Sequence, residues 1–211
     1  MDGLIRLLMN LPDLDIRRYG EGAVICRHEQ GHWPEDYIAV EQRPGGYAVC
    51  EAHRAQKTDK AFAHGEEEAA VLAAALGLHM FLAVANPDAD RQIRGSAEQS
   101  CEGQAARFLA SQLDTSLYSI GKEDPSRISL VKEGQKADVL FAGRPIVQGA
   151  PIPRAYVALY HYCRLLEAAR GLAVQAGAMG IPADPQKILC LCVSGDGRLP
   201  ADKGRGGRWG G

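Results

Sequence analysis

The stretch His64–Asp88, with the sequence HGEEEAAVLAAALGLHMFLAVANPD, decides how the rest of the chain is interpreted. From Ala69 to Ala85 it contains no residue that is charged at pH 7. A membrane-spanning helix needs about 20 predominantly apolar residues, and this run is shorter and rich in alanine. We therefore predict a buried helix rather than a membrane span. Because the helix is apolar all round, we expect other elements to cover it on several sides.

The flanking residues predict where this helix begins and ends. An acidic run, 66–68, falls in the first turn, where carboxylates interact favourably with the positive end of the helix dipole. Gly65 precedes it as an N-cap residue. The helix is expected to end at Asn86, because the residue before Pro87 is disfavoured in the helical region.

The composition is that of an ordinary globular protein. Of the 211 residues, 46% are hydrophobic and 24% are charged, which provides enough apolar material for a core. The net charge of −2 predicts no strong attraction to nucleic acid or to anionic membranes. The amino-terminal residues lack the basic leader of a signal peptide, and the six cysteines are scattered. We therefore expect a cytoplasmic protein with free thiols.

The first half predicts one helix and three strands before the buried helix. The predicted helix covers residues 4–11, and the predicted strands cover 22–29, 37–42 and 47–53. Arg43-Pro44-Gly45-Gly46 separates the last two strands, and its glycines can adopt positive φ, which favours a tight hairpin. The stretch 54–60, RAQKTDK, is polar and is predicted to be a connection.

The second half predicts the same order of elements. A helix is expected over 103–113, strands over 116–120, 128–132 and 137–142, a Pro/Gly-rich loop over 143–153, and a long helix over 154–176. The apolar run 187–195, KILCLCVSG, reads as a further strand, with Cys190 and Cys192 on one face.

These elements predict an α+β fold with two small antiparallel sheets covered by helices. The order of helix, three strands and helix occurs twice, which suggests an internal duplication that aligns the hairpins 37–50 and 128–140, with Val40 against Val131. The predicted domain division is a first half 1–86, a polar linker 87–102, a second half 103–195 that includes the extra carboxy-terminal strand, and a flexible tail 196–211.

Residue patterns for catalysis or metal binding are weak. Cys26, His28, Cys50 and His53 are chemically suited to zinc, but a regular strand places Cys50 and His53 on opposite faces. The sequence contains no G-x-S-x-G motif for a nucleophilic serine. We therefore predict no catalytic residue, no metal site and no cofactor.

The segment 37–77 resembles small immunity proteins of bacterial toxin systems. In those proteins a curved hairpin leads through a phenylalanine, a short polar step, acidic residues and Ala-Ala into a helix that ends in Leu-Gly. The corresponding residues here are Phe62, the run 66–68, Ala69-Ala70 and Leu76-Gly77. The resemblance implies a cytoplasmic protein without activity of its own that occludes the active site of a cognate toxin. One group of such proteins neutralises a secreted NAD-hydrolysing toxin.

The hypothesis from the residues is a non-enzymatic binding protein with a protein partner. Small antiparallel sheets leave a face or an edge that a partner can occupy. Exposed acidic groups are expected to face a basic cleft of that partner, and the candidates are Glu35, Asp36 and Glu41.

Three alternatives remain open. The first is a chaperone that binds an effector protein. The second is a small enzyme or ligand-binding domain with a pocket between the two halves, for which Cys50, Glu51 and His53 are the residues to test. The third is a homodimer in which sheets pair at their edges.

Overall fold

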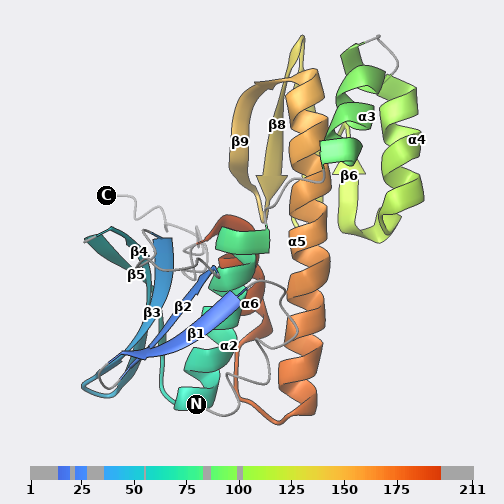
Figure 1. Ribbon diagram of the computed structural model, residues 1–211. Coiled ribbons are helices and arrows are strands. Elements are labelled where there is room, and N and C mark those ends of the chain that lie inside the picture. Colours follow the sequence, from blue (N-terminus) through green and yellow to red (C-terminus); the bar gives the residue numbers. More distant parts are fainter. Residues whose placement is uncertain are drawn as a thin grey trace, which may run out of the picture.

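The computed structural model describes residues 14–19, 22–27, 36–54, 56–82, 87–98 and 102–195, and they form an α+β fold (Figure 1). The first half contains β1 (Leu14–Tyr19), β2 (Gly22–Arg27), β3 (Asp36–Arg43), β4 (Gly46–His53), β5 (Gln56–Ala63), helix α2 (Glu66–Gly77) and the π-helix η1 (Leu78–Leu82). The remainder contains α3 (Pro87–Glu98), α4 (Glu102–Gln112), the 3₁₀-helix η2 (Thr115–Leu117), β6 (Tyr118–Ile120), β7 (Ile128–Glu133), β8 (Lys136–Phe141), β9 (Arg144–Pro151), α5 (Ile152–Ala178) and α6 (Pro185–Ser194).

The strands form two sheets of different topology. The first has the order β1-β2-β3-β4-β5, and every neighbouring pair is antiparallel. The second has the order β6-β7-β8-β9, and β6 is parallel to β7. The prediction of two antiparallel sheets is therefore wrong for the second, which is mixed. The connection 121–127 folds back beside β7: the amide of Gly121 donates to Leu130, and the amide of Asp124 donates to the hydroxyl of Ser129.

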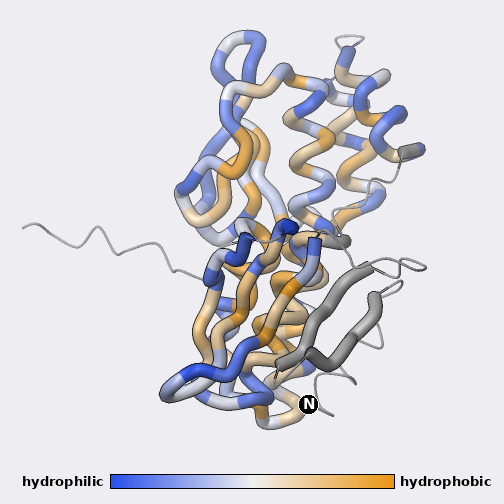
Figure 2. Tube along the Cα trace, turned by 60° about the vertical axis from the view of Figure 1, so that its left-hand side comes forward, coloured by the Kyte–Doolittle hydropathy of each residue, from blue (hydrophilic) through white to orange (hydrophobic). Residues whose placement is uncertain are grey.

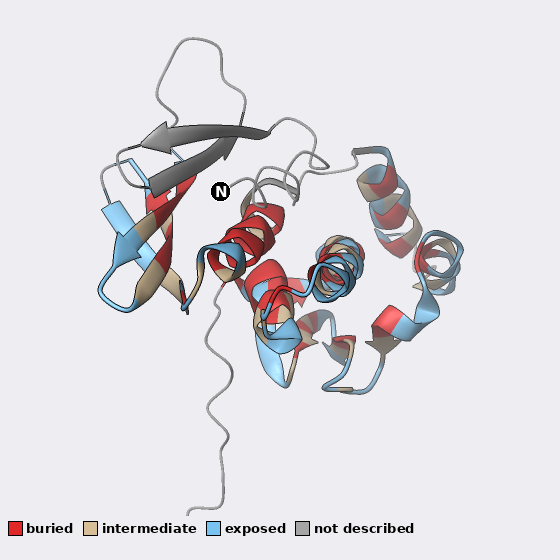
Figure 3. Ribbon diagram, turned by 90° about the horizontal axis from the view of Figure 1, so that it is seen from below, coloured by how far each residue is buried: buried red, intermediate tan, exposed pale blue. Residues whose placement is uncertain are grey.

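The predicted buried helix is confirmed as α2. Every residue from Ala69 to Gly77 is buried, and the helix lies between the first sheet on one side and α5 and α6 on the other (Figure 3). The many alanines allow this close approach because their side chains are short. The helix continues as η1 to Leu82, and the predicted end at Asn86 lies outside the described residues. Among the helices within the described ranges, none is both long and apolar enough to cross a membrane.

Two hydrophobic cores are joined by the last two helices. The first core lies between the first sheet and α2, and the second lies among the second sheet, α3 and α4. Figure 1 shows α5 running alongside both parts of the molecule. Tyr156 and Leu159 near its start belong to the second core, whereas Ala169 and Leu172 near its end belong to the first. Residues that follow the second sheet in sequence therefore complete the core of the first half.

The two halves share an arrangement of three antiparallel strands followed by a covering helix, namely β3-β4-β5-α2 and β7-β8-β9-α5. Both first hairpins have two-residue turns, because Arg43 pairs with Gly46 and Glu133 pairs with Lys136. Val40 pairs with Val49 in the first hairpin, and Leu130 pairs with Val139 in the second. When the two turns are superimposed, Val40 therefore corresponds to Leu130. The predicted match of Val40 with Val131 is therefore displaced by one residue.

Two segments predicted to be irregular are edge strands. Residues 54–60, predicted to be a connection, lie largely within β5, and the loop 143–153 contains β9. Edge strands tolerate the polar residues of β5 and the prolines of β9, because one side of the strand does not have to pair. Figure 2 shows hydrophilic residues concentrated toward the ends of the hairpins.

The segment 87–102 was predicted to be a polar linker, but most of it forms α3. This helix is hydrophilic except for a stripe at Ala89, Ile93 and Ala97, spaced four residues apart, and all three residues are buried in the second core. Asp90 on the same helix accepts a hydrogen bond from Nε2 of His161 on α5, at 2.8 Å. Through this narrow stripe α3 packs against α5 and α4.

The predicted strand 187–195 is wrong, because these residues lie in α6 and its C-cap. The carboxylate of Asp184 accepts a hydrogen bond from the amide of Gln186 at 2.9 Å, Pro185 opens the helix, and Gly195 ends it in the left-handed conformation. Helical geometry also separates the two cysteines predicted to share a face, since Cys190 belongs to the second core and Cys192 to the first. The predicted helix 4–11 and tail 196–211 lie outside the described residues.

Candidate functional site

The first sheet has two faces of different chemistry. Ile38, Val40 and Val49 point toward α2 and belong to the first core. The opposite face, which we call the outer face, carries a cluster of mostly small buried residues: Tyr37, Ala39, Ala48, Cys50 and Ala52. The centre of the inner face is therefore used by packing, and the outer face is the one on which a charged network is exposed.

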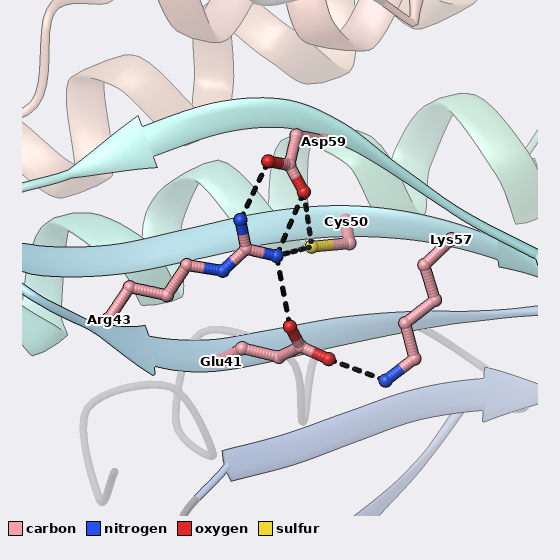
Figure 4. Close-up of polar contacts among 5 residues, drawn as sticks. All are labelled: Glu41, Arg43, Cys50, Lys57 and Asp59. Atoms are coloured by element: carbon pink, nitrogen blue, oxygen red, sulfur yellow. Dashed lines mark hydrogen bonds and ion pairs between the residues drawn. The ribbon is translucent and has the colours of Figure 1, made fainter.

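Four charged side chains form a continuous network across the outer face (Figure 4). Arg43 donates to both carboxylate oxygens of Asp59, at 2.8 and 3.1 Å, and to Glu41 at 3.1 Å. Lys57 donates to the other oxygen of Glu41. The relative solvent exposure of the four side chains lies between 33% and 57%, so the network is in contact with solvent. We call these four residues the outer-face network.

A β-bulge in β5 places Asp59 in this network. Cys50 pairs with Asp59, but its neighbour Val49 pairs with Ala61, so Lys60 is the extra residue. Asp59 therefore joins the outer face while Ala61 and Ala63 pack against the first core. A regular strand would put Asp59 and Ala61 on the same face, and a bulge removes that constraint.

Each ionisable group of the outer-face network holds its neighbours in the charged form. The hydrogen bond from Lys57, and then that from Arg43, lower the pKa of Glu41. The hydrogen bonds from Cys50 and Arg43 lower the pKa of Asp59. The two cations respond in the opposite direction, because the carboxylates raise the pKa values of Arg43 and Lys57. The network is thus fixed as two ion-paired acids and two ion-paired bases.

Cys50 lies beneath the network as a neutral thiol. Its Sγ donates to Oδ1 of Asp59 at 3.2 Å and lies 3.9 Å from Nη2 of Arg43. Burial, followed by the hydrogen bond and the negative charge of Asp59, raises the pKa of Cys50 to about 12. The thiol therefore serves as a hydrogen-bond donor rather than as a nucleophile.

This raised pKa predicts slow alkylation of Cys50. At pH 8 we expect iodoacetamide to modify Cys50 in the folded protein at least about 100-fold more slowly than in urea, because only the thiolate reacts. Peptide mass mapping of time points measures the rate at this residue alone. Equal rates in the folded and unfolded protein would show that the thiol is accessible and ionised.

The structure separates the acidic residues that the sequence proposed as a site. Asp36 and Glu41 lie on β3 but on opposite faces, because they are an odd number of residues apart. Asp36 contacts Nδ1 of His53, and both side chains are more than half exposed. Glu41 belongs to the outer-face network. Glu35 lies outside the described residues. The sequence therefore identified one member of the network.

Pairing of the polar segment 54–60 with the hairpin is the sequence feature that would have identified the other network residues. Arg43 ends the first strand of the hairpin, and a strand pairing at 54–60 would have placed Lys57 and Asp59 beside it. Sequence reasoning missed them because the bulge disrupts the alternation of β5. Within the described part of the chain, no group of three or more His, Cys, Asp and Glu residues is arranged to hold a metal ion.

A cavity lies where the two halves meet, as the ligand-binding alternative anticipated. Its volume is about 420 Å³, and it is lined from η1, α5, α6 and the β8–β9 hairpin. The residues proposed for such a pocket, Cys50, Glu51 and His53, are not among those that line it. Glu51 instead forms an ion pair with Lys60 at 2.8 Å.

His79, on η1, is the titratable imidazole of this cavity. Its Nδ1 lies 3.1 Å from the carbonyl oxygen of Cys192, so Nδ1 donates a proton to that oxygen. Burial lowers the pKa of His79 from its usual 6.5, and the hydrogen bond to Cys192 only partly opposes the shift. The folded protein therefore favours the neutral imidazole.

This depressed pKa predicts a loss of stability at mildly acidic pH. Below pH 6.5 the unfolded chain protonates His79 while the folded protein resists protonation, so the free energy of unfolding falls as the pH falls through this window. Urea unfolding at pH 7.5 and pH 5.5 measures the difference. We expect His79→Gln to reduce it and the exposed-site control His64→Gln to leave it unchanged. An unaltered pH dependence in His79→Gln would contradict this assignment.

Comparison of the chain with protein-family models, curated proteins and solved structures finds no match in any of the three. The outer-face network and the cavity are therefore interpreted from their own geometry.

Proposed function

We propose that this protein is a non-enzymatic binding protein that engages a protein partner through the outer face of β3, β4 and β5. The observation that carries the proposal is the outer-face network, in which Glu41, Arg43, Lys57 and Asp59 are held in fixed positions by their mutual ion pairs. Side chains that are already ordered lose less entropy on binding than free ones.

The chemistry of the outer face supports recognition rather than catalysis. The nearest nucleophile is Cys50, whose thiol is buried and has a raised pKa. The exposed groups are two acids and two bases, whose hydrogen-bonding capacity can be shared with complementary charges of a partner. Arrays of fixed charges of both signs favour specificity and correct register more than affinity alone.

The resemblance of residues 37–77 to bacterial immunity proteins supports a narrower version of the proposal. In that version the partner is a cognate bacterial toxin, and the protein acts in the cytoplasm by occluding the toxin's active site. Glu41 and Asp59 would then face basic residues of the toxin cleft, while Arg43 and Lys57 would contact acidic ones. An effector-binding chaperone would use the same surface with a different partner.

Affinity purification of the tagged protein from its native cells, with chemical cross-linking and mass spectrometry, identifies the partner. Calorimetry with the purified partner then compares the wild type with the double variant Arg43→Ala/Lys57→Ala. We expect the affinity to fall at least about tenfold, because hot-spot residues that meet charged groups each contribute about 1–2 kcal/mol or more.

A matched double variant, Lys136→Ala/Arg154→Ala, removes the same charges from exposed positions of the second half and is expected to bind like the wild type. Circular dichroism and thermal unfolding establish that both variants are folded. Unchanged affinity in the network variant would place the interface elsewhere. Recovery of no partner, together with a measurable turnover by the purified protein, would overturn the proposal.

A further inference from the structure

We propose that the cavity between the two halves binds a small organic monocarboxylate with an aromatic or branched apolar body. This site is distinct from the outer-face network, because none of the network residues lines it. Its volume of about 420 Å³ falls within the range of about 300–1,000 Å³ typical of small-molecule sites. It is built from both halves, since His79 comes from the first and Arg144 from the second.

Two unusual backbone conformations, distant in sequence, meet at this cavity. His79 lies in the five-residue π-helix η1, and single π-helical turns are rare and occur frequently at functional sites. Ala142, in the β8–β9 turn, has a φ of +50°, which is uncommon for a residue other than glycine. Backbone strain of this kind persists where the surrounding structure enforces it and is concentrated at binding and active sites. Both residues line the cavity.

The polar groups of the cavity fix the charge of the ligand. Among the described residues that line the cavity, Arg144 is the one that is charged at neutral pH, and none carries a carboxylate. A guanidinium binds a carboxylate through two parallel hydrogen bonds, which gives both affinity and orientation. A phosphate dianion would bring a second negative charge without a second cation, and an unpaired charge is unfavourable in a partly apolar site. The geometry therefore favours a monoanion.

His79 adds a hydrogen-bond acceptor. Because Nδ1 donates to the carbonyl of Cys192, Nε2 of the neutral ring carries the lone pair. A Cβ at Gly195 would lie 2.6 Å from Nε2, so glycine at this position leaves room beside that nitrogen. A ligand hydroxyl can donate to this nitrogen.

The remaining lining supplies an apolar environment for the body of the ligand. Aromatic rings come from Phe141 and Tyr162, and aliphatic surface comes from Ile146 and Val193. The combination of one cation, one acceptor and apolar walls matches a hydroxy acid with an aromatic side chain. 3-Phenyllactate contains all three features and is the probe for the experiment.

The test is calorimetry and ¹H–¹⁵N NMR titration of the full chain with 3-phenyllactate and three analogues. 3-Phenylpropionate lacks the hydroxyl, 3-phenyllactamide lacks the charge, and phenyl phosphate replaces the carboxylate with a dianion. We expect saturable binding of 3-phenyllactate with shifts at cavity residues, weaker binding of 3-phenylpropionate, and at least about tenfold weaker binding of the amide and of the phosphate.

Arg144→Gln removes the proposed carboxylate partner at an exposed position, and Arg154→Gln removes the same charge at an exposed site outside the cavity. We expect Arg144→Gln to weaken 3-phenyllactate binding at least about tenfold and Arg154→Gln to leave it unchanged. Absence of saturable binding to the wild type, tighter binding of the phosphate or the amide, or equal affinity in Arg144→Gln would each overturn the proposal.

Discussion

Replacing Leu72 with alanine is expected to lower the free energy of unfolding by about 2–5 kcal/mol. Leu72 lies in the middle of α2, is fully buried, and belongs to the first core. Several of its neighbours in the helix, namely Ala69, Ala73 and Ala75, have short side chains that cannot extend to fill the space that the substitution creates. The loss therefore combines the transfer free energy of the leucine side chain with the energy of an unfilled cavity.

Chemical denaturation at equilibrium, followed by circular dichroism, measures this effect. The control is Val174→Ala on α5, because Val174 is 73% exposed and its truncation is expected to change the free energy of unfolding by less than about 0.5 kcal/mol. If Leu72→Ala were as mild as the control, α2 would not be the packed centre of the first half.

Replacing Gly46 with alanine is expected to destabilise the protein by about 1–3 kcal/mol, toward the upper end of the range for overpacking. A Cβ at Gly46 would lie 2.1 Å from the backbone oxygen of Ala63 and 3.0 Å from the ring of Phe62. The ring can rotate, but the oxygen belongs to β5 and can move only if the strand moves. The substitution therefore forces the adjoining ends of β4 and β5 apart.

Hydrogen exchange of the amides of Tyr47 and Ala63, which lie opposite each other in this pair of strands, is expected to accelerate in Gly46→Ala. Gly171→Ala in the interior of α5 is the control, because a Cβ there meets no atom within 4 Å and alanine is favoured over glycine inside a helix. We expect the control to be no less stable than the wild type. A wild-type exchange pattern in Gly46→Ala would show that β5 can shift away from β4 without loss.

Local sequence patterns predict an element correctly where the residues of that element determine its conformation. The uncharged run after the acidic residues 66–68 predicted α2, and the two glycines after Pro44 predicted the β3–β4 hairpin. α6 shows the limit of this approach. Its start was encoded by Asp184 and Pro185 and its end by Gly195, yet the apolar run between them fits a strand as well as a helix. The capping residues indicate a helix, whereas the hydrophobic pattern does not distinguish a helix from a strand.

The candidate sites required information that lies outside any local window. Asp59 reaches the outer face because a bulge shifts the register of β5, and the register depends on the partner strand β4. His79 and Arg144 are far apart in sequence, and no local pattern indicates that they line the same cavity. They do so because α5 and α6 pack against both halves. The residues proposed from the sequence were chosen by charge and by proximity in the chain, and neither property determines which side chains meet.

The sequence by itself determined the α+β class, the buried central helix and the hairpins, because these depend on periodicity, capping and turn residues within short stretches. Only the tertiary structure decided which strands lie at the edges, how α5 and α6 are divided between two cores, and which side chains form the outer-face network and the cavity. The physical reason is that strand register and helix packing minimise the free energy of the whole chain, so contacts between distant segments select among local conformations that are nearly equal in energy.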